Sequence, residues 1–478
     1  MSAIDRHVFL KDYTRSLREG DAALFVGAGV SRSAGYVDWK QLLKEIAEDL
    51  ELDIDRESDL VALAQFHVNR RGGRDRLNQL LIDEFLEHVE LTPSHDLIAS
   101  LPIHTIWTTN YDDLLEVAFS NAKKRVDVKR RPADFSVTRR RADATIYKMH
   151  GDKTIPSEAI LTKEDYETYN ATRELFTITL KGDLAKKTFL FLGFSFSDPN
   201  VMYILGRVKQ LLETNSRKHY CILRAPTPHD YEDKEAGEYQ CKRFSHWLDD
   251  LRRYNIQPVL IERYDEVPEI LTELNRRSHL RDVFISGSAA DFAPFGQDKF
   301  HDLCRLLGFE LIKKDFNVVS GFGLGVGDLV TVGAMQALNR NDDERLQLWP
   351  FPQQVPSGTD RAALWRRYRE QMLSNAGVCI VLAGNKLVSG AIVPADGVKQ
   401  EAEIARSQGK FIIPIGATGH VAHELWEQCR AKPSDFVGEV NIAGSSEEFV
   451  GYLVHLGRAS VHSNTLPDRA SRRGQIGE

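Results

Sequence analysis

The chain has 478 residues, which is too many for one hydrophobic core, so two or three domains are expected. Its formal net charge of −7 argues against a general nucleic-acid binder, and no apolar run reaches the roughly 18 residues that span a bilayer. The N-terminus lacks a signal-peptide core and the five cysteines lack metal-ligand spacing, so we expect a cytoplasmic protein with no bound metal.

A glycine turn after a short apolar run is the first feature that indicates function. Residues 23–26 predict a buried strand, the next residues are small, and residues 39–52 have helical spacing. Small residues let backbone N–H groups approach a phosphate. The turn departs from the dinucleotide fingerprint G-x-G-x-x-G, which would need glycine in place of Arg32. A tight structural turn is an equally good explanation at this point.

Helices and strands alternate through the rest of the first half. Helical patterns are predicted at residues 8–17 and three times between residues 58 and 100, and we expect the latter to cover one side of a sheet. Further strands are predicted at the following places: 104–110, 144–150, from Lys187, 219–225 and 257–263. This alternation predicts a parallel, doubly wound α/β sheet.

Polar residues follow the predicted strands. One strand ends at Asn110, the next at His150, and a third leads into a loop with Gly193 and Ser195. The carboxyl ends of parallel strands meet at one edge, where open α/β sheets bind ligands. Asn110 could simply cap a helix and His150 could bond a turn, but an imidazole is also suited to be a general base near neutral pH.

The ordered set GAGVS, TTNYD, KMHGD and GFSF resembles the sirtuin family, which cleaves NAD between nicotinamide and ribose. The resemblance covers about residues 5–280. It implies that His150 is the catalytic base and that Asn110 faces the nicotinamide ribose with Asp112. The remaining NAD contacts that it implies are Gly27, Ala28, Gly29, Ser31, Thr109, Gly193 and Ser195.

Two departures from the sirtuins favour plain hydrolysis over protein deacylation. The four zinc-binding cysteines of the deacylases are missing, and Thr109 stands where they carry glutamine. Cleavage of the bond to nicotinamide develops oxocarbenium character on the ribose and releases a neutral base. The reaction therefore needs a base for water and a dipole that favours positive charge, which His150 and the Asn110 oxygen would supply.

A second alternation of strands and helices begins near residue 281 and predicts another parallel α/β domain. Its strand ends carry the glycine-rich stretches SGS, SGFGLGVG, AGNK and GATG, which suit a phosphate-containing ligand. Arg369, Lys386 and Glu401 are candidates to reach the same edge and would suit a diphosphate with sugar hydroxyls. Each could instead lie on a solvated helix face. We expect domains at 1–280 and 281–458, and a disordered tail at 459–478.

The second half resembles the SLOG superfamily of nucleotide-ligand sensors, and the two halves together resemble the NAD-cleaving effectors of Thoeris antiphage systems. In that family a cyclic ADP-ribose isomer made by a TIR-domain partner activates the enzyme, which assembles as a homo-oligomer, so a tetramer or larger is expected. The resemblance implies activator contacts at Ser288, Gly323, Arg369, Lys386, Glu401, Gly416, Ala417, Thr418 and Gly419.

Two other functions remain open from the sequence. An NAD-dependent protein deacylase would consume acyl-lysine and NAD one-to-one. A nucleotide-binding scaffold would hold NAD and leave it intact, although simple binding needs neither Asn110 nor His150.

Overall fold

The computed structural model describes residues 3–36, 39–85, 89–212, 215–339, 343–352, 358 and 360–431. Contacts within the chain separate it into two units, Met1–Ser278 and His279–Glu478, which we call unit 1 and unit 2. Across the described ranges, no helix combines the length and apolar character needed to cross a membrane. The tail expected to be disordered, 459–478, lies outside the described residues.

Unit 1 is built on a sheet of seven parallel strands in the order β3-β4-β2-β1-β5-β6-β7. The strands are β1 (Ala22–Val26), β2 (Thr105–Thr108), β3 (Val126–Lys129), β4 (Ala144–Lys148), β5 (Thr188–Leu192), β6 (His219–Arg224) and β7 (Ile256–Ile261). The chain proceeds from β1 toward β3 and β4 on one side and from β5 toward β7 on the other. The strand order therefore reverses at β1 and β5, and such a switch point is where open sheets bind ligands.

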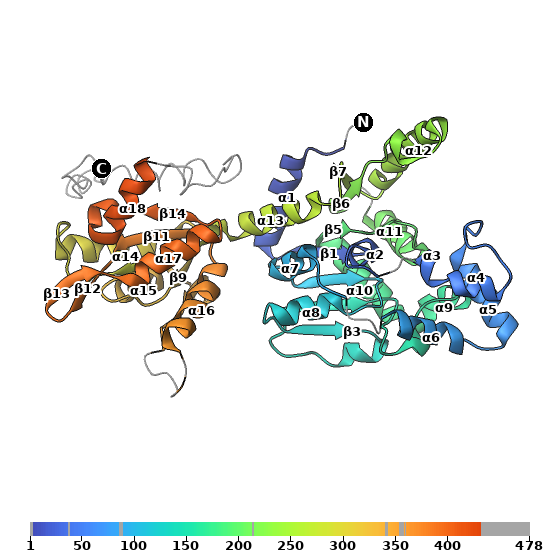
Figure 1. The fold of residues 1–478 in the computed structure, drawn as a ribbon, viewed down its shortest axis with the longest axis horizontal. Coiled ribbons are helices and arrows are strands. Elements are labelled where there is room, and N and C mark those ends of the chain that lie inside the picture. Colours follow the sequence, from blue (N-terminus) through green and yellow to red (C-terminus); the bar gives the residue numbers. More distant parts are fainter. Residues whose placement is uncertain are drawn as a thin grey trace, which may run out of the picture. The chain divides into compact units, whose positions relative to one another are not determined.

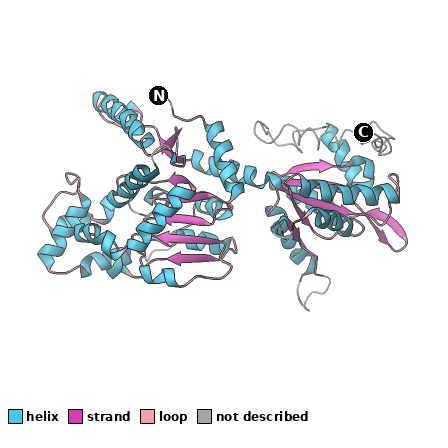
Figure 2. Ribbon diagram, turned by 180° about the vertical axis from the view of Figure 1, so that it is seen from behind, coloured by secondary structure: helices cyan, strands magenta, loops and turns pink. Residues whose placement is uncertain are grey.

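Both faces of this sheet are covered by helices, as Figure 2 shows for the magenta strands. Alternate residues of β1 enter different cores: Leu24 packs with one set of helices and Phe25 with the other. The first set is α1 (Arg6–Glu19), α7 (Pro93–Ser100), α8 (Leu114–Asn121) and α13 (Glu266–Ser278). The second set is α9 (Lys163–Thr172), α10 (Glu174–Lys186), α11 (Pro199–Leu212) and α12 (Lys234–Arg252). Burial on both faces explains why the strands are nearly continuous apolar runs.

A separate group of helices forms its own small core beside the sheet (Figure 1). It comprises α3 (Trp39–Leu42), α4 (Lys44–Asp49), α5 (Leu60–Arg71) and α6 (Asp75–Glu84). Their apolar residues pack with Ala159 and Leu161, which follow β4 in the chain. Arg74 adds a link, because its Nη2 donates to the carbonyl of Ala159 at 2.7 Å. This group of helices is thus attached to the segment that comes just after His150.

Unit 2 repeats the architecture with a five-stranded parallel sheet in the order β10-β9-β8-β11-β14. The strands are β8 (Asp282–Ser288), β9 (Asn317–Ser320), β10 (Leu346–Leu348), β11 (Val378–Ala383) and β14 (Phe411–Pro414). One face carries α14 (Gln297–Lys313) and α15 (Gly327–Ala337), and the other carries α16 (Arg361–Ser374), α17 (Asp396–Ser407) and α18 (His420–Ala431). The strand order reverses at β8 and β11, so this pair marks the second switch point.

The predicted α/β class and its two parallel sheets are confirmed, with four local errors. Of the three helices expected between residues 58 and 100 to cover the sheet, only α7 does so, while α5 and α6 form a separate core with α3 and α4. The edge strand β3 was missed, because its sequence VDVK is short and half charged. The helix predicted over 39–52 is not the one that follows the glycine turn; α2 (Ala28–Arg32) begins directly there and α3 and α4 come later. The antiparallel hairpin of β12 (Asn385–Val388) and β13 (Ala391–Pro394) was also missed.

Candidate active site

The loops that leave β1 and β5 contact each other through glycine backbone. The amide of Gly29 donates to the carbonyl of Gly193 at 2.9 Å, and Gly193 has φ +61°. A Cβ atom added at Gly27 would lie 2.5 Å from the Gly193 oxygen, closer than real contacts allow. The glycines of the GAGVS and GFSF motifs are therefore needed for the closure of these two loops, whatever ligand lies beside them.

Asn110 lies at the end of β2 with its amide group oriented by the β1 loop. Its Nδ2 donates to the Gly27 carbonyl at 3.2 Å and to Ser31 Oγ at 2.9 Å. The side chain is buried, and its Oδ1 has no hydrogen-bond partner among the described residues. A buried acceptor without a partner costs about 1–3 kcal/mol, so such atoms are typical of sites where a ligand binds.

Ser31 connects Asn110 to Asp112. Its hydroxyl accepts from Asn110 and donates to Asp112 Oδ2 at 2.7 Å. The other oxygen of Asp112 accepts from the backbone N–H of Leu114 at 3.1 Å, at the start of α8. Three residues that the sequence separates by up to 81 positions thus form one buried chain of hydrogen bonds.

His150 lies at the same level as Asn110 on the neighbouring strand. Thr108 of β2 is in register with Lys148 of β4, and both predicted catalytic residues come two positions later. The His150 ring is buried, and its Nε2 is 3.2 Å from Asp198 Oδ2. The structure therefore brings Asn110 and His150 to one edge of the sheet and adds a carboxylate from the loop after β5.

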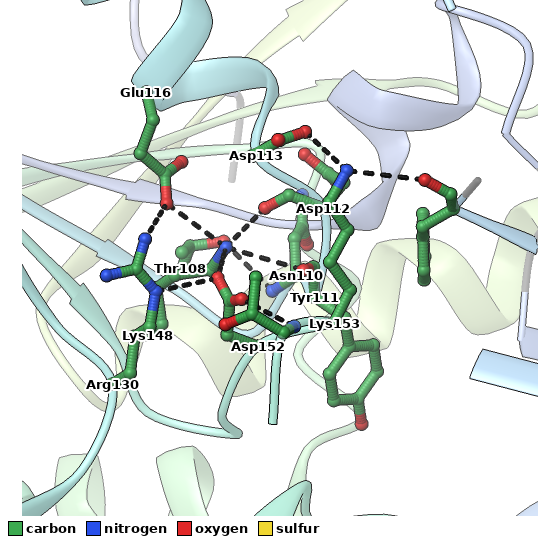
Figure 3. A network of polar contacts seen from close by, with 12 residues as sticks. Thr108, Asn110, Tyr111, Asp112, Asp113, Glu116, Arg130, Lys148, Asp152 and Lys153 are labelled. Atoms are coloured by element: carbon green, nitrogen blue, oxygen red, sulfur yellow. Dashed lines mark hydrogen bonds and ion pairs between the residues drawn. The ribbon is translucent and has the colours of Figure 1, made fainter. Parts of the chain in front are cut away.

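A buried cluster of charges lies beneath the Asn110 loop (Figure 3). Lys148 has no solvent exposure, and its Nζ contacts Glu116 at 3.2 Å and Asp152 at 2.5 Å. It also donates to the backbone carbonyls of Tyr111 and Asp112. Burial by itself lowers the pKa of the Lys148 amine, but the neighbouring carboxylates outweigh burial and raise it. The ammonium is therefore retained, and it ties the loop that carries Asn110 to β4.

The other NAD-contact residues expected in unit 1 lie around this edge. Ala28, Gly29, Gly193 and Ser195 are exposed, and Thr109 is half-buried. The hydroxyl of Ser195 is within 2.6 Å of the Ser197 hydroxyl. These exposed positions are open to a ligand, whereas Gly27, Ser31, Asn110, Asp112 and His150 form the buried floor.

In unit 2 the structure brings together two of the three charged residues expected to bind the activator. Arg369 Nε is 3.4 Å from Glu401 Oε1, and both side chains are buried. Glu401 also accepts a hydrogen bond of 2.6 Å from Ser286 at the end of β8. Burial raises the pKa of the Glu401 carboxyl, opposed by Ser286 and Arg369. The Arg369 guanidinium lies over the ring of Phe351 at 4.8 Å.

Lys386 and Ser288 make separate contacts close to this pair in the fold. Lys386, on the hairpin, bonds Asp396 at 2.5 Å, and Asp396 begins the helix that carries Glu401. Ser288 donates to the carbonyl of Asn385 at 2.8 Å. Asn385 itself is buried and joined to the 290–291 backbone through both ends of its amide, so it holds the loop after β8.

The glycine loops of unit 2 repeat the close backbone contact of unit 1. A Cβ at Gly323 would lie 1.8 Å from the Gly287 oxygen, so the loop after β9 touches the end of β8 there. In the 416–419 turn, Gly416 packs on Trp426, Gly419 has φ +80° and Ala417 is half-buried. The Thr418 hydroxyl accepts from the Ala383 amide and donates to the Ile415 carbonyl. Thr418 thus has a structural role, and its hydroxyl is already occupied.

Sequence reasoning missed Lys148 and its partners. A lysine at the end of an otherwise apolar strand was the available signal, because such a group needs buried carboxylates nearby. Sequence analysis also assigned no role to Asp198, which follows Ser195 in the loop after β5. In the described part of the chain, no group of three His, Cys, Asp or Glu side chains is arranged to hold a metal ion.

Comparisons with known proteins agree with this two-unit organisation. A family model described as "SIR2-like domain" matches residues 104–256, and one described as "Sir2- and TIR-associating SLOG family" matches residues 266–454. The NAD(+) hydrolase ThsA of Bacillus cereus (strain MSX-D12) is 43% identical over 464 residues, which are 94% of this chain and 97% of that protein. This chain belongs to the ThsA family of NAD(+) hydrolases. A second ThsA, from Acinetobacter baumannii (strain 532279), is 42% identical over 89% of this chain and 90% of that protein.

A further protein is similar to only part of this chain. Defense-associated sirtuin 2 of Bacillus subtilis is 29% identical over 274 residues, which are 55% of this chain and 26% of that protein. Membership of the ThsA family confirms the resemblance inferred from the four strand-end motifs and from the order of the two halves.

Proposed function

We propose that unit 1 hydrolyses NAD+ to nicotinamide and ADP-ribose as an effector of bacterial antiphage defence. The observation that carries the proposal is the buried Asn110 amide: its nitrogen is bonded to Gly27 and Ser31, and its oxygen is left without a partner. His150 lies at the same level on the next strand. The proposal is supported by the names of the ThsA relatives and of the defence-associated sirtuin.

The chemistry assigns one task to each of these two residues. As the bond between nicotinamide and ribose breaks, positive charge develops on the ribose and the Asn110 oxygen stabilises it. His150 takes a proton from the attacking water, because a neutral imidazole is a good base near pH 7. Nicotinamide leaves as a neutral molecule and needs no acid. The remaining contacts, Gly27, Ala28, Gly29, Ser31, Thr109, Asp112, Gly193 and Ser195, would hold the rest of NAD+.

The test is nicotinamide release by the purified full-length chain and by two variants, with a cyclic ADP-ribose isomer present. We expect Asn110→Ala and His150→Ala each to lower the rate at least about a hundredfold, the loss typical of removing a general base or a preorganised dipole. NAD+ turnover at the wild-type rate in either variant would remove that residue from the mechanism.

We also propose that a cyclic ADP-ribose isomer binds unit 2 and activates unit 1. Support comes from the buried Arg369–Glu401 pair, which offers a cation for a diphosphate and a carboxylate for sugar hydroxyls. We expect further contacts to the activator from Ser288, Gly323, Lys386 and the 416–419 turn, which surround this pair. The source would be a TIR-domain partner protein, consistent with the description of the family that matches unit 2. The enzyme would act in the cytoplasm as a homo-oligomer.

A further inference from the structure

We propose that Asp198 is the positioning residue for His150 in NAD+ hydrolysis, which rests on the function proposed above. The two residues come from strands that are not neighbours: His150 follows β4, and Asp198 lies in the loop after β5, with β2 and β1 between them in the sheet. Asp198 Oδ2 is 3.2 Å from His150 Nε2, an ion-pair distance at which the present ring orientation makes no hydrogen bond, and both side chains are more than 90% buried. A buried carboxylate at this distance both orients an imidazole and stabilises its protonated form.

Capping of helix α11 explains only one of the two oxygens of the Asp198 carboxylate. Asp198 Oδ1 accepts a hydrogen bond of 2.8 Å from the Val201 amide at the start of α11, which is an ordinary helix-capping contact. That contact occupies only one oxygen. The second oxygen faces His150 and accepts from the Tyr166 hydroxyl at 3.3 Å, so the carboxylate is fixed from two sides.

Asp198 is held in its ionised form. Burial by itself raises the pKa of the Asp198 carboxyl, but the charge of His150 and the hydrogen bonds from Val201 and Tyr166 outweigh burial, and the pKa lies below its ordinary value. The other titratable groups that face the ring are Tyr166 and Tyr169, both on α9. Burial raises the pKa of both phenols, so they remain neutral. Asp198 is therefore an ionised carboxylate that lies against the His150 ring.

The pairing decides which ring nitrogen acts as the base. We place the proton on Nε2, the ring nitrogen that lies 3.2 Å from Asp198, so Nδ1 carries the free electron pair. The water oxygen bonds to the ribose carbon as the bond to nicotinamide breaks, and Nδ1 takes one water proton. The imidazolium formed is stabilised by Asp198 and then releases its proton to solvent. The overall reaction converts NAD+ and water into nicotinamide, ADP-ribose and a proton.

The test replaces Asp198 by asparagine in the full-length chain, because an amide oxygen can still cap α11 while the charge is removed. The matched control is Asp233→Asn, which changes the exposed capping aspartate of α12. We expect Asp198→Asn to lower kcat for nicotinamide release about 10- to 100-fold with a smaller change in KM, and Asp233→Asn to leave both unchanged.

A second readout separates positioning from a general structural role. Asp198→Glu keeps the carboxylate, so we expect it to recover part of the kcat that Asp198→Asn loses, whereas a purely structural role would not separate the two variants. A kcat of Asp198→Asn within twofold of wild type, or an Asp198→Glu variant no more active than Asp198→Asn, would overturn the proposal for Asp198 alone. Absence of nicotinamide release from the wild-type chain with a cyclic ADP-ribose isomer present would overturn the proposed function as well.

Discussion

At the scale of single residues, the site depends on a chain of hydrogen bonds from Gly27 through Asn110 and Ser31 to Asp112. The Asn110 nitrogen donates to two acceptors, Ser31 donates to Asp112, and the chain ends at the first turn of α8. The amide of Asn110 cannot rotate without losing both bonds made by its nitrogen. This fixes the direction of the Asn110 oxygen, which has no hydrogen-bond partner among the described residues.

Ser31 should therefore affect catalysis by orienting the Asn110 amide. Ser31→Ala removes the acceptor of one Asn110 bond and the donor to Asp112, and we expect kcat to fall about tenfold while the free energy of unfolding falls by about 1–2 kcal/mol. Ser33→Ala is the control, because that hydroxyl donates only to the Val30 carbonyl in the same short helix. Nicotinamide release and urea unfolding measure the two effects. Equal behaviour of the two variants would contradict the role given to Ser31.

Lys148 should be a major contributor to the stability of unit 1. Lys148→Met leaves Asp152 and Glu116 as buried carboxylates without that partner, and we expect a loss of about 3–5 kcal/mol in the free energy of unfolding. Lys153→Met, which removes a partly exposed pair with Asp113, should cost less than about 1 kcal/mol. Chemical denaturation of both variants measures the difference, and a small effect of Lys148→Met would show that the buried cluster adapts.

At the scale of elements, the fold depends on two loops that meet at the switch point. The strand order places the ends of β1 and β5 next to each other, and only glycine backbone leaves room for their contact. The same solution appears in unit 2, where Gly323 meets Gly287. Glycines read from the sequence as phosphate-binding positions thus have a packing role as well.

A methyl group at Gly27 tests that packing role. Gly27→Ala would set Cβ 2.5 Å from the Gly193 oxygen and 2.7 Å from Phe194 Cα, so the loops must separate, at a cost of about 1–3 kcal/mol. We expect lower thermal stability and loss of most NAD+ hydrolysis, because the Gly27 carbonyl also holds Asn110. Gly182→Ala, on the exposed side of α10 with open space around it, should be neutral or slightly stabilising. A Gly27→Ala variant as stable as wild type would refute the packing role of Gly27.

Strands buried on both faces could be predicted from the sequence, because their apolar runs are long and end in polar motifs. The gathering of the motif residues at one edge of the sheet could be predicted from the parallel topology alone. The edge strand β3 could not be predicted, since it is not a sustained apolar run. The hairpin of β12 and β13 was missed although β13 is apolar and Ser389 and Gly390 between the strands are a turn signal. The Asp198–His150 pair also could not be predicted, because it joins two loops whose distance depends on the whole strand order.

At the scale of the whole molecule, we propose that the chain combines an enzyme unit with a unit that senses a ligand. A ligand of unit 2 can change the activity of unit 1 only if it binds the active arrangement better than the resting one. Arg369 is the residue through which we expect the ligand to be recognised, since its guanidinium is buried beside Glu401 and Phe351.

Arg369→Ala should abolish activation and leave unit 1 folded. We expect the variant to show the same NAD+ hydrolysis with and without a cyclic ADP-ribose isomer. Arg366→Ala, on the same helix and paired with Glu370 at the surface, should respond like the wild type. Nicotinamide release over a range of ligand concentrations measures the response. An Arg369→Ala variant that is still activated would remove this residue from the sensor site.

The central claim is that the full-length chain breaks the bond between nicotinamide and ribose and transfers the ribose to water. The most direct measurement follows NAD+, nicotinamide and ADP-ribose by chromatography, with a cyclic ADP-ribose isomer present and no acyl-lysine added. The account predicts that NAD+ is lost and that both products appear one-to-one, with almost none from Asn110→Ala. NAD+ that stays intact, or that is consumed only when an acyl-lysine peptide is supplied, would contradict it.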